Sequence, residues 1–211
     1  MYPVWKRSLD VVLAAIGLVA TAPVLLGAIA SIFVTMGRPV FFFQVRPGRH
    51  ETPFTLIKLR TMCLRSNRSS AESDASDEKR LTRLGRWLRR TSIDELPSLI
   101  HVLSGTMSLV GPRPLLMRYL PHYTDRERMR HTVRPGLTGW AQIHGRNHVR
   151  WDERLALDVW YVENCSLALD LRILWQTLGL VLSRNGVVDD PTTQQPDFDV
   201  ARRASADASS S

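Results

Sequence analysis

Two adjacent carboxylates, Asp94 and Glu95, lie between arginines in the sequence. Arg89 precedes them, and Arg113 follows in a Gly-Pro-Arg-Pro segment whose prolines restrict the backbone. An ionised aspartate can attack phosphorus and form an aspartyl phosphate. Nearby arginines on a stiff support would stabilise the charge of the phosphoryl group during its transfer. These residue types at this spacing therefore indicate phosphoryl transfer, with Asp94 as the nucleophile.

The same pair also fits a structural role. Ser92 and Glu95 are three residues apart, which is the spacing of a capping box at the start of a helix. That role would explain Glu95 and leave Asp94 unassigned. In the first turn of a helix the positive end of the helix dipole stabilises an anion, which predicts an ionised Asp94 with a lowered pKa.

A glycine-rich segment, residues 133–147, adds further basic side chains at Arg134 and Arg146. Its glycines would allow a phosphate to approach the backbone closely. His144 and His148 are four residues apart, but the segment is loop-like and supplies no third ligand, so they do not predict a zinc site. A carboxylate-bound Mg²⁺ is better supported, since Mg²⁺ prefers oxygen ligands and substrate phosphates.

The segment Val11–Met36 carries no charged residue. About 20 helical residues span a hydrocarbon core, so this run is long enough to cross a membrane. Pro23 lies near its middle, where it breaks or kinks a helix. Basic residues flank the run on both sides, namely Lys6, Arg7, Arg38, Arg46 and Arg49. Because basic flanks favour the cytoplasmic side, we predict a re-entrant helix–break–helix hairpin over residues 1–37, with Lys6 and Arg7 at the membrane interface. A proline-kinked single span is the alternative.

The rest of the sequence divides into two parts. Residues 38–188 combine short apolar strands with helical patterns and are predicted to form a cytoplasmic catalytic domain, with strands at Val40–Phe43 and Phe54–Leu59. Helical segments predominate, so we predict a helix-rich α/β fold with a small β component. Residues 189–211 are rich in Pro, Gln, Ser and Ala and are predicted to be a disordered tail.

The composition points to anionic partners. The chain has 211 residues and a formal net charge of +8, which suits phosphorylated substrates, phospholipid surfaces or nucleic acid. Cys63 and Cys165 show neither metal-ligand spacing nor a disulfide framework, so reduced thiols in the cytosol are expected. Composition alone does not separate the three kinds of partner.

Motifs along most of the chain carry a family resemblance. They are Lys6-Arg7 with Asp10, the proline-broken apolar run, PVFFFQVRPG, the Lys58-to-Met62 stretch, TSIDELP, MSLVGPRP, VRPGLTGWAQ followed by GRN, and the pattern of Tyr161, Ser166 and Asp170. With these motifs the chain resembles the bacterial sugar transferase family, the small monotopic polyprenyl-phosphate phosphoglycosyltransferases. The resemblance extends from Lys6 to about Gly186. His101 and His144 depart from it, because the family more often has Asn at these positions.

The resemblance implies a two-step transfer of a sugar 1-phosphate. Asp94 would attack the β-phosphate of a UDP-sugar and release UMP, and undecaprenyl phosphate would then take the phosphosugar from the carboxylate. Glu95 matches the family's second acidic residue, which with Asp94 would hold Mg²⁺ or position phosphate. Arg89, Arg113 and Arg146 match arginines around the bound phosphates.

The resemblance also implies a location and partners. It places the chain on the cytoplasmic face of the bacterial inner membrane, in contact with phospholipid and without a nucleic-acid partner, where it would initiate a cell-surface glycan. The sugar and the formation of a homodimer stay open. Two rival functions are a single-span protein whose basic domain binds nucleic acid or anionic lipid, and an inactive scaffold subunit of a glycan-assembly complex. Neither rival gives the acidic pair a role.

Overall fold

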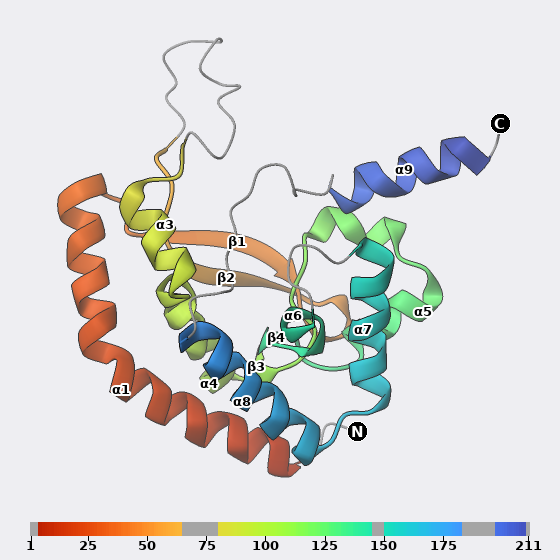
Figure 1. The fold of residues 1–211 in the computed structure, drawn as a ribbon, viewed down its shortest axis with the longest axis horizontal. Coiled ribbons are helices and arrows are strands. Elements are labelled where there is room, and N and C mark those ends of the chain that lie inside the picture. Colours follow the sequence, from red (N-terminus) through yellow and green to blue (C-terminus); the bar gives the residue numbers. More distant parts are fainter. Residues whose placement is uncertain (1–3, 65–79, 145–149, 183–196, 210–211) are drawn as a thin grey trace, which may run out of the picture.

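A computed structural model describes residues 4–64, 80–144, 150–182 and 197–209 (Figure 1). Within these residues helices dominate, and two small two-stranded sheets lie among them. This confirms the prediction of a helix-rich fold with a small β component. In chain order the elements are α1 (Val4–Met36), β1 (Phe41–Pro47), η1 (Arg49–Glu51), β2 (Pro53–Leu59), α3 (Arg83–Arg90), η2 (Ile93–Ser98), α4 (Leu99–Ser104), β3 (Ser108–Val110), η3 (Met117–His122), α5 (Asp125–Arg128), η4 (Met129–His131), β4 (Gly136–Thr138), α6 (Trp140–Ile143), α7 (Trp151–Glu163), α8 (Leu167–Leu182) and α9 (Phe198–Ser209).

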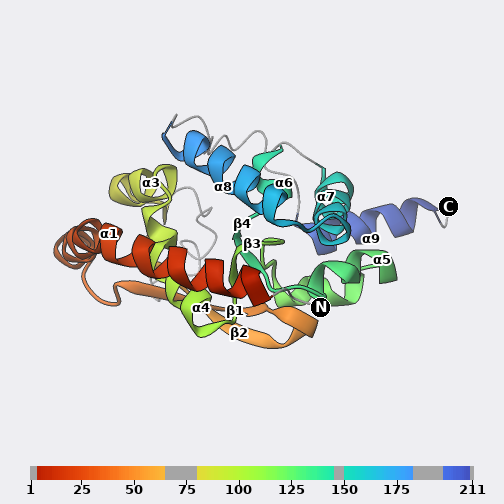
Figure 2. The same cartoon turned by 90° about the horizontal axis from the view of Figure 1, so that it is seen from below.

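Helix α1 is long, apolar and bent. Its 33 residues would measure about 50 Å in a straight helix at 1.5 Å per residue. Instead the helix changes direction along its course, so that its two arms lie at an angle (Figures 1 and 2), and Pro23 lies inside it. Ala14 and Ile32 are fully buried, but most of its apolar side chains are half-buried or exposed. By length and composition this helix is able to anchor the chain in a membrane.

The first arm of α1 is held by buried polar side chains. Lys6 is 2% exposed, and its ammonium donates to the Tyr161 hydroxyl at 3.2 Å and to the Asp170 carboxylate. Asp10 is also buried and accepts a hydrogen bond of 3.0 Å from the Leu109 N–H. These contacts attach the start of α1 to α7, α8 and β3.

The predicted place of Lys6 and Arg7 at the membrane interface stays a prediction, but the structure gives both side chains partners within the protein. The Lys6 ammonium is enclosed by protein. The Arg7 guanidinium donates to the Leu103 carbonyl at 2.7 Å and to the Val102 carbonyl, both near the end of α4. The sequence could not reveal this, because the partners of these two side chains lie 95 to 164 residues away.

The second arm of α1 ends at Met36, where Arg60 caps it. The Arg60 guanidinium donates to the carbonyls of Met36 (2.6 Å) and Gly37 (2.7 Å). The last carbonyls of a helix lack partners within the helix, so this buried guanidinium satisfies them. Ile32 of the same arm packs in a cluster with Leu88 of α3. Both ends of α1 are therefore attached to the same folded domain.

Strands β1 and β2 form an antiparallel hairpin, which confirms the two predicted strands. Their register pairs Phe42 with Lys58 and Arg46 with Phe54. Since alternate residues of a strand share a face, Arg46 and Lys58 project from the same face of the hairpin. Strand β2 also packs directly on η2, the segment that contains the acidic pair.

Strands β3 and β4 form a short parallel pair that joins two proline- and glycine-containing loops. The Gly136 N–H donates to the Pro112 carbonyl at 2.9 Å. A Cβ atom on Gly136 would lie 2.1 Å from the Gly111 nitrogen, so only glycine allows the two backbones to approach this closely. This contact fixes the loop that carries Arg113.

The C-terminal tail differs from its predicted disorder. Residues 189–196 lie outside the described part of the chain, but Phe198–Ser209 forms helix α9. Phe198 is 1% exposed and packs in a cluster with Tyr119 and Tyr123. The polar composition of the tail predicted disorder, whereas a single aromatic side chain at the start of α9 finds an apolar site on the domain.

Candidate active site

The acidic pair lies in a turn of 3-10 helix, and the predicted capping box does not form. Ser92 adopts a left-handed conformation with φ of 56°, and its side chain makes no capping hydrogen bond. Glu95 does not reach back to the helix start either, because its carboxylate binds cations. The structural explanation of Glu95 is therefore wrong.

Glu95 lies at the centre of an ion-pair cluster. Its Oε1 atom is 2.6 Å from Lys58 Nζ and 2.6 Å from Arg113 Nη2, while Arg113 Nη1 is 3.4 Å from Oε2. Burial alone would raise the pKa of Glu95, but the charges of Arg113 and Lys58 outweigh it and hold this pKa well below its usual range. Glu95 is therefore ionised and fixes both cations in place.

Asp94 has the opposite environment. It is 8% exposed, and within the described residues its carboxylate accepts no hydrogen bond. Burial, and then the neighbouring charge of Glu95, raise the pKa of Asp94 to about 6, while Lys58, Arg113 and Arg89 act against this shift. The predicted lowering of this pKa is thus wrong, because burial outweighs the effect of a short helical turn. At neutral pH Asp94 is still mostly ionised, and its oxygens are not engaged.

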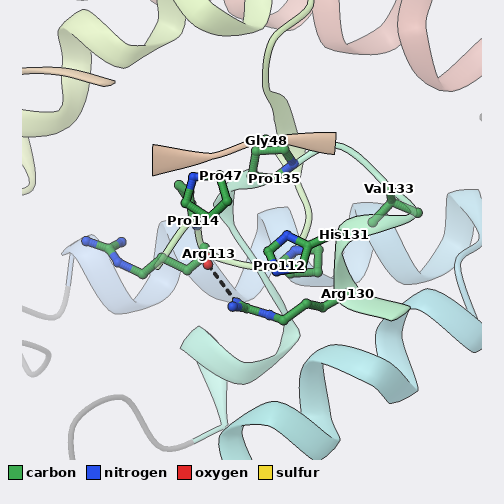
Figure 3. A pocket seen from close by; sticks show the side chains of 9 residues that line it. All are labelled: Pro47, Gly48, Pro112, Arg113, Pro114, Arg130, His131, Val133 and Pro135. Carbon is green, nitrogen blue, oxygen red and sulfur yellow. Dashed lines mark hydrogen bonds between the residues drawn. The ribbon is translucent and has the colours of Figure 1, made fainter. Parts of the chain in front are cut away.

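A hydrogen bond fixes the backbone of Arg113, while its side chain extends towards Glu95 and solvent. The Arg113 carbonyl accepts a hydrogen bond of 2.7 Å from Arg130, and the Arg113 side chain extends in the opposite direction (Figure 3). Its side chain remains 43% exposed although it binds Glu95, so one edge of the guanidinium stays accessible. The charge of Glu95 raises the pKa of Arg113 further, so that it is a permanent cation.

Sequence reasoning missed two cations of this site, Lys58 and Arg46. Arg46 Nη2 is 2.5 Å from Gln44 Oε1, and burial together with the charge of Arg113 lowers the Arg46 pKa to about 10. Burial and Arg113 likewise lower the pKa of Lys58, with Glu95 acting against them. The predicted first strand ends at Phe43, before Arg46. Side-chain alternation places Arg46 and Lys58 on one face only when that strand continues to Pro47, as β1 does.

A pocket open to solvent lies beside the cluster. Cations and Glu95 form one part of its wall, and apolar side chains form the other. Its lining residues are Arg46, Leu56, Lys58, Glu95, Ser98, Met107, Arg113, Pro114, Leu115, Gly136 and Leu137. Such a mixed wall suits a ligand with a phosphate at one end and a less polar group at the other.

The remaining predicted residues have separate placements. Arg89 donates to Thr61 Oγ1 at 3.0 Å and lies close enough to Asp94 to act on its pKa. Arg146 lies outside the described residues. His101 accepts a hydrogen bond of 3.2 Å from the backbone of β2, and the His144 ring lies tilted against Trp140 with centroids 3.8 Å apart.

The predicted magnesium ion stays a prediction, for which the described residues of the site offer Asp94 as a carboxylate that is not already paired. The described part of the chain contains no group of three or more His, Cys, Asp or Glu side chains placed to hold a metal. The Glu95 oxygens already bind Arg113 and Lys58. Asp94 is thus the carboxylate that would hold Mg²⁺, with phosphate oxygens of a substrate as further ligands.

Comparison with known proteins gives a family. The model of the family described as bacterial sugar transferase matches residues 1–184. An uncharacterized sugar transferase of Bacillus subtilis, EpsL, is 52% identical over 86% of this chain and 89% of its own. A UDP-glucose:undecaprenyl-phosphate glucose-1-phosphate transferase of Caulobacter vibrioides is 41% identical over 84% of this chain and 70% of its own.

Other relatives are longer. An undecaprenyl-phosphate galactose phosphotransferase of Salmonella typhimurium is 36% identical, and the match covers 86% of this chain but 41% of the relative. The chain therefore spans most of the Bacillus relative and less than half of the Salmonella one. These matches confirm the resemblance inferred from the motifs. The chain belongs to the bacterial sugar transferase family.

Proposed function

We propose that this enzyme transfers a sugar 1-phosphate from a UDP-sugar to undecaprenyl phosphate and releases UMP, as the first membrane step of a cell-surface glycan. The names of the Caulobacter and Salmonella relatives support the two substrates. The observation that carries the proposal for this chain is the contrast within the acidic pair. Asp94 has unengaged oxygens, while Glu95 fixes two cations beside it.

In the first step an Asp94 oxygen attacks the β-phosphorus of the UDP-sugar. The new bond joins the carboxylate to phosphorus, and the bond from phosphorus to the bridging oxygen breaks. UMP leaves with that electron pair, and the phosphosugar stays on Asp94. Arg113 and Lys58 are placed to stabilise the charge on the transferring phosphoryl group, and Arg46 adds a third cation on the same wall.

In the second step a phosphate oxygen of undecaprenyl phosphate attacks the same phosphorus. The carboxylate of Asp94 leaves and is regenerated, and an undecaprenyl-diphosphate-linked sugar is released. Mg²⁺ held by Asp94 and substrate phosphates would supply charge neutralisation. Because the phosphoryl group leaves a carboxylate, no protein group needs to donate a proton at this step.

The geometry of α1 supports a re-entrant hairpin on the cytoplasmic face of the inner membrane. Lys6 attaches the first arm to the domain, and Arg60 attaches the end of the second. A helix whose two ends bind one domain enters and leaves on the same side, and the bend of α1, which contains Pro23, makes this possible. The hairpin would hold Asp94 at the depth of the phosphate of the lipid substrate.

The test is UMP release by detergent-solubilised protein with Mg²⁺, undecaprenyl phosphate and a panel of UDP-sugars. We expect release with at least one sugar, and a stoichiometric burst without undecaprenyl phosphate that leaves labelled phosphosugar on the protein. Arg113→Ala should lower the rate by about tenfold or more. Full turnover by Asp94→Asn, or turnover without any protein-bound phosphosugar, would exclude the covalent mechanism.

A further inference from the structure

Helix α9 docks on the domain through Phe198. This residue is 1% exposed, and its ring lies 5.3 Å from that of Tyr123 in a stacked arrangement. It also contacts the rings of Tyr119 and Trp151, each at a centroid distance of 5.5 Å. An aromatic side chain buried among other rings contributes more to docking than its exposed neighbours do. Phe198 is therefore the main anchor of α9.

Polar contacts surround this anchor. The Tyr119 hydroxyl donates to Asp197 at 2.8 Å, and Arg118 pairs with Asp197 and, at 3.7 Å, with Asp199. Arg202 pairs with Glu127 and, at 3.1 Å, with Asp152. Ion pairs that keep contact with solvent add little stability individually. Because these ion pairs lie on both sides of Phe198, together they nevertheless fix the orientation of α9 on the domain.

The ring that Phe198 covers is connected to the candidate active site. The Tyr123 hydroxyl accepts a hydrogen bond of 2.9 Å from Arg130 Nη1. Arg130 is 2% exposed, and its Nη2 donates to the Arg113 carbonyl at 2.7 Å and to Asp158 at 2.7 Å. Burial makes this ion pair costly to disturb, because separating it would leave an unpaired charge inside the protein.

The last link is the Arg113 backbone. Pro112 and Pro114 flank it, so a shift of the Arg113 carbonyl cannot be absorbed by free rotation of the neighbouring residues. A shift of the backbone would therefore also move the Arg113 guanidinium, whose Nη2 lies 2.6 Å from Glu95 Oε1. Contacts therefore run without a gap from Phe198 through Tyr123 and Arg130 to Arg113, the cation that binds Glu95 beside Asp94.

We propose that Phe198 is a positioning residue of the active site, which holds Tyr123 and Arg130 and thereby fixes Arg113. Phe198 lies outside residues 1–184, the part matched by the family model, so this is a feature of the chain beyond the family domain. The proposal rests on the function proposed for Arg113. Phe198 touches no reacting group, and its effect passes entirely through Arg113.

The experiment measures UMP release by the full-length Phe198→Ala protein, with Val200→Ala as the matched control on the same helix. Val200 is 54% exposed and contributes no anchor. We expect Phe198→Ala to lower kcat/KM by about tenfold, since small displacements of a positioned group cost much rate. Val200→Ala should stay within about twofold of the wild type.

A double substitution separates positioning from simple destabilisation. If Phe198 acts through Arg113, then Phe198→Ala should change kcat/KM by less than about twofold in an Arg113→Lys background. Equal losses in both backgrounds would overturn the proposal, as would full activity of a folded Phe198→Ala protein. Full activity of Arg113→Lys and Arg113→Ala would instead remove Arg113 from the mechanism and overturn the proposed function together with this inference.

Tyr123→Phe provides a second variant in case Phe198→Ala does not fold. It keeps the ring under Phe198 and removes only the hydroxyl that binds Arg130. We expect a similar loss of kcat/KM that is again absent in the Arg113→Lys background, with little change in Tm. Wild-type activity of Tyr123→Phe would show that the contact with Arg130 has no influence on Arg113.

Discussion

Lys6 at the start of α1 and Asp170 in α8 form a buried ion pair across 164 residues of sequence. The side chains are 3% and 2% exposed, and the Tyr161 hydroxyl binds both partners. The pair joins the proposed membrane hairpin to the catalytic domain at a point next to β3. The loop after β3 carries Arg113, so the same attachment that fixes α1 also contributes to the framework of the site.

We expect Lys6→Met to destabilise the protein strongly. The substitution leaves Asp170 buried without its cation, and breaking a buried pair on one side typically costs about 3–5 kcal/mol. Denaturant unfolding in detergent measures the change, with the exposed Val12 replaced by Ala as the control on the same helix. The double variant Lys6→Met/Asp170→Leu should recover part of the loss. An unchanged unfolding midpoint for Lys6→Met would contradict the structural role of the pair.

The pH dependence of kcat/KM should report the raised pKa of Asp94. Only the ionised carboxylate attacks phosphorus, and burial followed by the charge of Glu95 raises this pKa to about 6. The rate should therefore be constant above pH 7 and fall about tenfold for each unit below pH 6. Circular dichroism over the same range controls for unfolding. A flat profile from pH 5 to 8 would argue against Asp94 as the group that must ionise.

Asp94→Asn should abolish turnover and increase stability at neutral pH. The folded protein binds the Asp94 proton more tightly than the unfolded chain does, so wild-type stability falls as the pH rises from about 4 to about 6. Asparagine avoids the cost of burying the ionised carboxylate. The rise of the Asp94 pKa from 3.8 to about 6 corresponds to a cost on the order of 3 kcal/mol. Thermal unfolding at pH 7.5 and at pH 4 measures the difference, which should shrink at the lower pH. A variant less stable than the wild type at pH 7.5 would contradict this environment for Asp94.

Much of the fold followed from local pattern. The two strands of the β1–β2 hairpin and the long apolar helix were predictable, because alternation and a charge-free run are properties of neighbouring residues. The identity of Asp94 and Arg113 as candidate site residues followed from motifs. The burial of Lys6 could not be predicted, because it depends on Asp170 in a distant helix.

The chemistry of the site was less accessible to the sequence. The pKa of Asp94 depends on burial that only the packed structure creates, and burial reversed the expected direction of the shift. Lys58 joins Glu95 only once the hairpin packs on η2. Phe198 looked like one residue of a polar tail, and its anchoring role required the cluster of Tyr119, Tyr123 and Trp151.

Glu95→Gln should lower kcat/KM and also shift the acidic limb of its pH profile to lower pH. Glu95 raises the pKa of Asp94, second only to burial, and it neutralises Lys58 and Arg113. Its removal should therefore lower the Asp94 pKa, while two cations lose the group that orients them. We expect kcat/KM at pH 8 to fall by about tenfold or more and the midpoint of the pH profile to shift below that of the wild type. A midpoint that stays in place would show that the charge of Glu95 does not reach Asp94.

The topology of α1 can be tested by cysteine labelling, because the chain provides its own reference. Cys63 is exposed in the catalytic domain, just after β2, so a Cys165→Ser protein should label there. In a Cys63→Ser/Cys165→Ser background, Val4→Cys places a thiol at the first described residue of α1, which is 83% exposed. A membrane-impermeant maleimide should label both positions in inverted membrane vesicles and neither in intact cells, because a hairpin keeps both ends of α1 with the domain. Labelling of Val4→Cys from outside intact cells, with Cys63 protected, would mean that α1 crosses the membrane and that the contacts of Lys6 with α8 do not form there.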